Sequence, residues 1–276
     1  MKRLEYQEKK PGIISCKNEP LPYRYPDMKV AYKAFSETYK IPQDNFILTN
    51  GCENALRIAL LALKPKKIFA EHPRWELFDV ICEGLDIKIK NVNYIYDGEE
   101  FYSEIKHNKN RIYYSTESYN NLFRHKNLNV ENGISILDET YTMSTLLNEK
   151  RAIKENEIVI GSFSKVASPG IRLGYIIFNK KYVDIMNLLR EQYISEGAVD
   201  YILKKKKAAI PNISIDTLNI EGLICCNHVY VTTDKKPPES NWLPYRNFTV
   251  SGKDFYRIGY HDKLAEIIEN VNSSKN

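Results

Sequence analysis

The sequence has few cysteines, no long apolar run and no internal repeat. Its five cysteines among 276 residues include no Cys-x-x-Cys pair. Since an odd number without paired spacing is atypical of a disulfide framework or a zinc site, we expect a cytoplasmic protein without a metal centre. No apolar stretch approaches the roughly 20 residues of a transmembrane helix, and the opening residues Met-Lys-Arg-Leu-Glu contain no apolar signal core. We therefore expect no membrane partner.

The charge imbalance is small. Lysine and arginine number 40 and aspartate and glutamate 35, which gives a net charge of +5. Because this surplus is spread along the chain, it does not favour nucleic acid as a partner, and an anionic cofactor or substrate fits equally well. With 43% hydrophobic residues, the chain can form a substantial core in one or two domains.

The most informative stretch is the segment 161–175. Apolar runs at 158–160 and 175–178 flank it, which predicts a strand, a loop and a second strand. The loop carries hydroxyl groups, the amine of Lys165 and the guanidinium of Arg172. A desolvated lysine near another cation loses its proton more easily and can attack a carbonyl to form an imine, and arginine grips a phosphate with two hydrogen bonds. The pattern indicates a phosphorylated aldehyde, pyridoxal 5′-phosphate.

The extended motif is more specific than these single residues. It reads Ser-Phe-Ser-Lys from Ser162, then Pro-Gly-x-Arg-Leu-Gly-Tyr from Pro169. It resembles the cofactor-lysine segment of fold-type I pyridoxal-phosphate enzymes, in the class I/II aminotransferase superfamily that includes histidinol-phosphate aminotransferase and threonine-phosphate decarboxylase. The resemblance implies that Lys165 forms the imine and that Ser162 and Arg172 hold the cofactor phosphate. The arginine stands seven positions after the lysine, whereas many members have it at eight.

A second motif, Thr-Asn-Gly-Cys-Glu from Thr49, lies between an expected strand at 46–49 and an expected helix at 55–63. A strand, a glycine turn and a helix start form an anion site, because free N–H groups and the helix dipole point at the ligand. The resemblance implies that Gly51, Cys52 and Glu53 line the cofactor phosphate mainly through backbone N–H groups. Cys52 replaces a small or hydroxyl residue of the family.

Four further residues match positions that contact the cofactor ring in the resembled family. The resemblance implies that Trp75 stacks on the pyridine ring, that Asp138 pairs with its nitrogen, and that Tyr141 and Asn120 contact its phenolic oxygen, with Asn121 as the alternative to Asn120. A carboxylate keeps the ring nitrogen cationic, so that the ring can accept electrons. The loop around Asn120 lacks the family's prolines and glycine, and a tryptophan such as Trp75 is otherwise often a core or interface anchor.

Two positions outside this central part are also implied by the resemblance. Tyr25, in an Arg-Tyr-Pro-Asp segment, corresponds to a tyrosine that reaches the cofactor phosphate of the partner subunit, so we expect a homodimer with shared sites. Arg257, in Phe-Tyr-Arg-Ile, corresponds to the arginine that grips the substrate α-carboxylate. The alternatives are a surface tyrosine before a helix and a surface arginine on a strand.

Strands alternate with helices across residues 44–178, which predicts an α/β domain with a mostly parallel sheet. The resemblance implies the large domain of fold type I, with a seven-stranded sheet sandwiched by helices, and a reduced α+β small domain. The expected organisation is an N-terminal arm at 1–26, a cofactor-binding large domain at 27–180 and the C-terminal small domain at 181–276.

The function implied is an aminotransferase that moves an amino group between an amino acid and a keto acid through a Lys165 Schiff base, with Lys165, Asp138 and Tyr141 as catalytic residues. One alternative is a decarboxylase on the same scaffold, acting on an amino acid or a phosphorylated amino acid. A third hypothesis, a non-catalytic relative used for binding, is less consistent with the presence of the lysine, the aspartate and the arginine.

Overall fold

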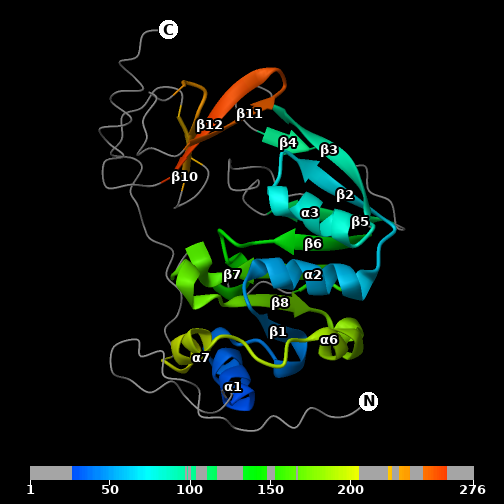
Figure 1. The fold of residues 1–276 in the computed structure, drawn as a ribbon, viewed down its shortest axis with the longest axis vertical. Coiled ribbons are helices and arrows are strands. Elements are labelled where there is room, and N and C mark those ends of the chain that lie inside the picture. Colours follow the sequence, from blue (N-terminus) through cyan, green and yellow to red (C-terminus); the bar gives the residue numbers. More distant parts are fainter. Residues whose placement is uncertain are drawn as a thin grey trace, which may run out of the picture.

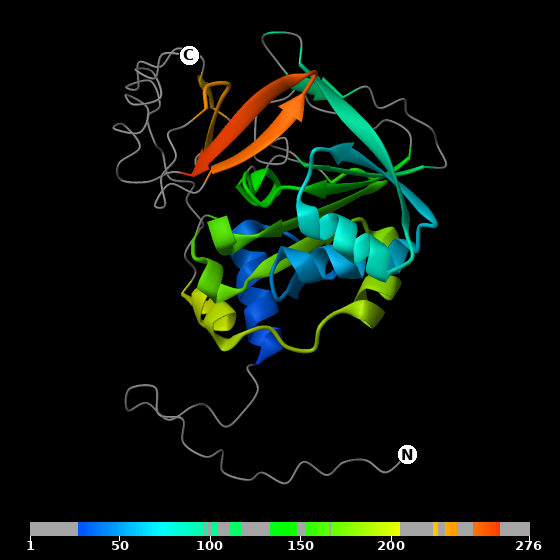
Figure 2. The ribbon, with the colours of Figure 1, turned by 45° about the horizontal axis from the view of Figure 1, so that its top comes forward.

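The computed structural model describes residues 27–96, 98, 101–103, 111–116, 133–147, 153–165, 167–204, 223–225, 230–236 and 245–259. These residues form one large sheet with helices on both faces and one smaller antiparallel sheet (Figures 1 and 2). Tyr25, Asn120 and Asn121 lie outside the described residues.

The large sheet has the strand order β1-β8-β7-β6-β5-β2-β3-β4. Neighbouring strands are parallel from β7 to β3, whereas β8 is antiparallel to both β1 and β7, and the short β4 is antiparallel to β3. The prediction of a mostly parallel seven-stranded sheet is confirmed, with β4 as an added edge strand. The strands are β1 (Phe46–Thr49), β2 (Lys67–His72), β3 (Lys88–Tyr96), β4 (Phe101–Ser103), β5 (Ile112–Thr116), β6 (Ile134–Asp138), β7 (Glu157–Ser162) and β8 (Gly174–Phe178).

Helices cover the two faces of this sheet. They are α1 (Met28–Tyr39), α2 (Cys52–Leu63), α3 (Glu76–Gly84), α5 (Ser144–Leu147), α6 (Val183–Leu189) and α7 (Glu196–Leu203). Side chains cap the N-termini of two of these helices. Asp27 accepts a hydrogen bond from the N–H of Lys29 at the start of α1, and Ser195 accepts one from the N–H of Ala198 at the start of α7. Among these helices of the described ranges, none has the length and hydropathy that crossing a bilayer requires.

Two apolar cores lie on opposite faces of the sheet. On one face, α2, α3 and α6 pack against side chains that include Phe78, Tyr114 and Ile176. On the other face, α1, α5 and α7 pack against a set that includes Phe163 and Tyr175. Consecutive residues of a strand point to opposite faces, so a continuously apolar strand such as β8 supplies both cores, as expected for a sheet covered on both sides.

The strand directions bring several sequence motifs to one edge of the sheet. Thr49 at the end of β1 and Ser162 at the end of β7 both pair with Gly174, the first residue of β8. Asp138 ends β6, which runs parallel to β7. Ligands of open α/β sheets bind beyond the carboxyl ends of the parallel strands, so this edge is the expected location of a ligand site.

The smaller sheet has the order β11-β12-β10-β9 and consists of antiparallel pairs of β9 (Leu223–Cys225), β10 (Tyr230–Thr233), β11 (Tyr245–Val250) and β12 (Lys253–Gly259). It meets the large sheet at the end of β3, where the N–H of Tyr96 donates to Ser251 Oγ (3.0 Å) and the Tyr96 ring contacts Phe255 edge-on.

The domain division at 26/27 and 180/181 stays a prediction. Within the described residues, the helices that directly follow residue 180 pack on the large sheet, since Met186 of α6 belongs to one core and Ala198 and Ile202 of α7 belong to the other.

Candidate active site

The sheet edge brings together seven of the residues that the sequence singled out. They come from the turn between β1 and α2, from the end of β6 and from the loop between β7 and β8, and they are Gly51, Cys52, Asp138, Tyr141, Ser162, Lys165 and Arg172. Contacts link these three segments. Cys52 Sγ lies 3.8 Å from Asp138, Lys165 Nζ lies 5.3 Å from the centre of the Tyr141 ring, and Arg172 lies against Gly51.

Asp138 is the most deeply placed charged group of this cluster. Its carboxylate accepts hydrogen bonds from the hydroxyl of Tyr114 (2.9 Å) and the N–H of Thr140 (2.9 Å), and a weaker one from Cys52. Burial raises the pKa of Asp138, and the hydrogen bonds from Thr140, Tyr114 and Cys52 act against this by stabilising the carboxylate. The hydrogen bonds hold the carboxylate in one orientation, whereas burial makes its charged form less favourable.

Tyr114 is a functional neighbour that the sequence reasoning missed. It lies on β5, is fully buried, and stacks on Phe78 of α3 with ring centres 4.2 Å apart. Burial and the nearby charge of Asp138 raise the pKa of its phenol well above the usual value, so it remains a hydrogen-bond donor. From the sequence, a tyrosine in a short apolar strand is expected to be a core residue. The parallel pairing of β5 with β6 places its hydroxyl at Asp138.

Cys52 is the first residue of α2. Burial and the charge of Asp138 raise the pKa of its thiol well above the usual value. The group is therefore a thiol that donates to Asp138, and not the thiolate that a nucleophile or metal ligand requires.

The turn before α2 depends on Gly51. Its φ of 88° lies in the region that favours glycine, and a Cβ there would lie 3.0 Å from Nη2 of Arg172. Arg172 in turn donates to the carbonyl of Asn50 (3.3 Å). On the other side, a Cβ on Gly174 would lie 2.5 Å from the carbonyl carbon of Gly51. The absence of side chains at both glycines therefore lets the two loops touch and places the guanidinium at the helix start.

Lys165 ends a single 3-10 turn, Phe163–Lys165, that directly follows β7. Phe163 anchors the turn in the core of the α1 face, where its ring contacts Phe35 and Tyr175 edge-on. The half-buried Lys165 is thereby held beside Tyr141, at the edge rather than in the core.

The hydroxyl of Ser162 makes its described contacts inside the β7–β8 loop. It donates to the carbonyl of Leu173 (3.2 Å), accepts from the N–H of Ser164 (3.1 Å) and lies 3.1 Å from the Ser164 hydroxyl. These bonds tie the two ends of the loop together, and a contact of Ser162 with phosphate stays a prediction.

The remaining candidates among the described residues are Glu53, Trp75 and Arg257. Glu53 forms an ion pair with Arg57 one turn along α2 (3.0 Å). Trp75 precedes α3 and packs half-buried against the core of the α2 face. Arg257 lies in the smaller sheet, opposite Thr232 of β10.

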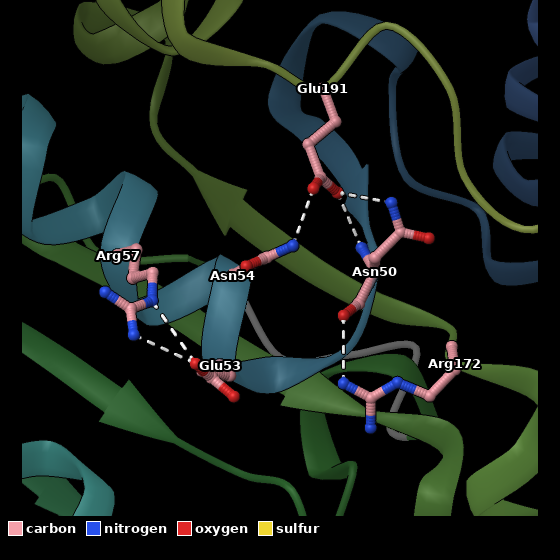
Figure 3. A network of polar contacts seen from close by, with 6 residues as sticks. All are labelled: Asn50, Glu53, Asn54, Arg57, Arg172 and Glu191. Carbon is pink, nitrogen blue, oxygen red and sulfur yellow. Dashed lines mark hydrogen bonds and ion pairs between the residues drawn. The ribbon is translucent and has the colours of Figure 1, made fainter. Parts of the chain in front are cut away.

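A second set of polar groups, also missed from the sequence, surrounds Asn50. Figure 3 shows Asn50 and Asn54 turned toward the carboxylate of Glu191, whereas Glu53 turns toward Arg57. Glu191 Oε2 accepts from the backbone N–H of Asn50 (2.6 Å) and Glu191 Oε1 from the side-chain amide of Asn54 (2.6 Å). The glutamate comes from the connection between α6 and α7, 141 residues from Asn50.

Part of the chain matches a known protein family. Residues 103–207, which include Asp138, Lys165 and Arg172, match the family described as aminotransferase class I and II. No curated protein matches the chain.

Solved structures share the fold at low sequence identity. The L-threonine-O-3-phosphate decarboxylase of Porphyromonas gingivalis is 14% identical, with 90% of this chain and 88% of that chain covered at a TM-score of 0.67. The histidinol-phosphate aminotransferase of Clostridium acetobutylicum is 15% identical, with 91% of each chain covered at 0.64, and the aspartate aminotransferase of Thermotoga maritima is 17% identical, with 90% and 83% covered at 0.64. Residues 103–207 thus match the class I and II aminotransferase family, and the chain has the fold type I architecture of these solved structures.

Proposed function

We propose that this protein is a pyridoxal-phosphate-dependent aminotransferase that exchanges an amino group between an amino acid and a keto acid. The observation that carries the proposal is the meeting, at one sheet edge, of a buried carboxylate, a lysine and an arginine at a helix start. These are Asp138, Lys165 and Arg172, and all three lie in the segment that matches the aminotransferase family.

The residues fit pyridoxal 5′-phosphate in charge and in order. The start of α2 supplies N–H groups without partners inside the helix, Gly51 leaves the space there free of a side chain, and Arg172 adds a cation. Asp138 would hold the ring nitrogen, and Lys165 would hold the aldehyde. When bound, the cofactor supplies an electron-accepting ring that stabilises negative charge at the substrate α-carbon.

The chain's own residues then have distinct tasks. Asp138, fixed by Tyr114 and Thr140, keeps its negative charge directed at the site. When its amine is free, Lys165 would move a proton at the substrate α-carbon, a step for which general acid–base groups contribute about 10²- to 10⁴-fold in rate. Tyr141 lies beside the Lys165 amine and would contact the phenolic oxygen of the cofactor.

Several further proposals rest on the family resemblance. Arg257 would bind the substrate α-carboxylate, Asn120 and Trp75 would contact the cofactor ring, and Ser162 and the N–H groups of Cys52 and Glu53 would contact its phosphate. The enzyme would work in the cytoplasm as a homodimer in which Tyr25 reaches the site of the partner subunit.

A decarboxylase is the second candidate, because it needs the same lysine, aspartate and arginine and differs only in which bond at the substrate α-carbon is broken. Incubation of the protein with amino acids, with and without keto acids, separates the two. Release of carbon dioxide without transfer of the amino group would favour decarboxylation.

The proposal is tested by trapping the linkage between lysine and cofactor. The protein is mixed with pyridoxal 5′-phosphate, reduced with borohydride, digested and analysed by mass spectrometry. We expect the reduced cofactor on the peptide that contains Lys165 and none in Lys165→Ala. Lys181→Ala, which changes a lysine at the surface near Glu155, is the matched control and should keep the label. A label on another peptide, or no label, would overturn the proposal.

A further inference from the structure

The residue before the proposed phosphate turn is held by one carboxylate. Glu191 Oε2 accepts from both the backbone N–H (2.6 Å) and the side-chain amide (3.2 Å) of Asn50, and Oε1 accepts from the amide of Asn54 (2.6 Å). Glu191 therefore bridges the residue before Gly51 and a residue in the first turn of α2. Hydrogen bonds to a charged acceptor are the stronger kind in proteins.

The segment that carries Glu191 makes further bonds to the same place. The Asn50 amide also donates to the carbonyl of Tyr193 (3.1 Å), and Asn50 Oδ1 accepts from the N–H of Ser195 (3.0 Å). Ser195 Oγ donates to the carbonyl of Ile171 (2.6 Å), next to Arg172. The connection between α6 and α7 thus fixes the turn before α2 and the arginine loop at the same time.

Arg172 completes the arrangement by donating to the carbonyl of Asn50 (3.3 Å). Asn50 is consequently bonded through its N–H, its side chain and its carbonyl, and each of the two elements proposed to hold phosphate is tied to it (Figure 3). Preformed donors bind an anion more tightly than donors that must be ordered on binding, because the entropy cost has already been met.

We propose that Glu191 is a positioning residue for the cofactor phosphate: its carboxylate holds Asn50 and Asn54 so that the start of α2 and Arg172 are preset for a phosphate group. The inference rests on the proposed function. A carboxylate suits this task because it only accepts hydrogen bonds, whereas the amide of a glutamine would present a donor to one of the two asparagines.

The test compares ligands with and without the phosphate group. Purified apoprotein is titrated with pyridoxal 5′-phosphate, with pyridoxal and with inorganic phosphate, for the natural sequence and for Glu191→Gln, Glu191→Ala and Asn54→Ala. Glu155→Gln serves as the matched control, because this carboxylate lies at the surface near Lys181. Circular dichroism establishes that each variant is folded.

We expect Glu191→Gln and Glu191→Ala to weaken binding of pyridoxal 5′-phosphate about ten- to a hundredfold, as loss of a hydrogen bond to a charged group does, and Asn54→Ala to weaken it less. Binding of pyridoxal, which lacks the phosphate, should change little. A general loosening of the fold would instead weaken the binding of both ligands. Equal loss for both ligands, or unchanged binding of the phosphorylated one, would overturn the inference. If the natural protein binds inorganic phosphate but not the cofactor, and Glu191→Gln weakens that phosphate binding, the positioning of a phosphate group by Glu191 stands and the proposed function fails.

Discussion

Two neighbouring carboxylates, Asp138 and Glu139, lie on opposite faces of the large sheet and have much in common. Both are buried, and both accept a hydrogen bond from a fully buried tyrosine: Asp138 from Tyr114 on the α2 face, and Glu139 from Tyr175 (2.8 Å) on the α1 face. The alternation of side chains at the end of β6 is enough to send consecutive residues into two different environments.

Their other neighbours differ. Glu139 also accepts from the hydroxyl of Ser144 (3.1 Å) and the N–H of Thr145 (2.8 Å), so it caps the start of α5 from within the core. Asp138 instead meets the thiol of Cys52 at the start of α2, in the segment that also touches Arg172. Burial and a tyrosine partner therefore do not distinguish a site carboxylate from a structural one. The two carboxylates are distinguished by the chain segments that meet around each of them.

The largest expected effect separates the two carboxylates by activity. Asp138→Asn removes the charge proposed to face the cofactor ring, and loss of a hydrogen bond to a charged group should lower kcat/KM about ten- to a hundredfold. Transamination assays with excess cofactor measure this. The comparison breaks if Glu139→Gln lowers kcat/KM by the same factor.

The next effect separates them by stability. In Glu139→Gln the new amide donor faces either Tyr175, at one oxygen position, or Ser144 and Thr145, at the other. All three donate to the natural carboxylate, and a buried polar group left unsatisfied costs about 1–3 kcal/mol. Urea unfolding of the apoprotein should show this loss, with cofactor affinity unchanged. An unaltered midpoint would show that Glu139 does not stabilise the fold.

A pair of tyrosine variants sharpens the comparison further. Tyr114→Phe and Tyr175→Phe each remove one buried hydroxyl and should each cost about 1 kcal/mol of unfolding free energy. Only Tyr114→Phe should alter the pH profile of cofactor binding, because the hydrogen bond from Tyr114 lowers the pKa of Asp138. Without it, that pKa rises, and binding that needs the carboxylate should be lost at a higher pH on the acidic side. Equal profiles for both variants would contradict the assignment.

The smallest expected effect is on the pH dependence of apoprotein stability. Burial raises the pKa of Asp138 above its unfolded value of 3.8, so the native state binds this proton more tightly than the unfolded chain does. Its contribution to stability is full below pH 3.8 and is lost as the pH rises through the native pKa. The stability of Asp138→Asn relative to the natural protein should therefore increase with pH across that window, as measured by urea unfolding. A constant difference would contradict the raised pKa.

The sequence is informative where a function is carried by residues close together in the chain. The alternation of strands and helices predicted the large sheet, and the motifs around Gly51, Asp138 and Lys165 each follow directly after a strand. The resemblance to a family implied that these residues share one site, and they meet in the structure because parallel strands end at the same edge of the sheet. The roles assigned to them, and to Arg257 on the smaller sheet, stay predictions.

Contacts between distant segments could not be read in this way. Tyr114 and Asp138 meet through the pairing of β5 with β6, and Glu191 reaches Asn50 across 141 residues. Neither tyrosine nor glutamate has a local pattern that reveals such a partner, since a tyrosine in an apolar strand and a glutamate between two helices are both ordinary. Likewise, the packing of α6 and α7 on the large sheet depends on long-range burial that periodicity alone does not assign.

The close approach of Gly174 to Gly51 restricts how this protein can diversify. A Cβ added at position 174 would lie 2.5 Å from the carbonyl carbon of Gly51, so the backbones of the two loops pack directly against each other. Insertions or deletions in one would have to be matched in its neighbour, so an engineer who transplants this region into another scaffold should move both loops as a single cassette.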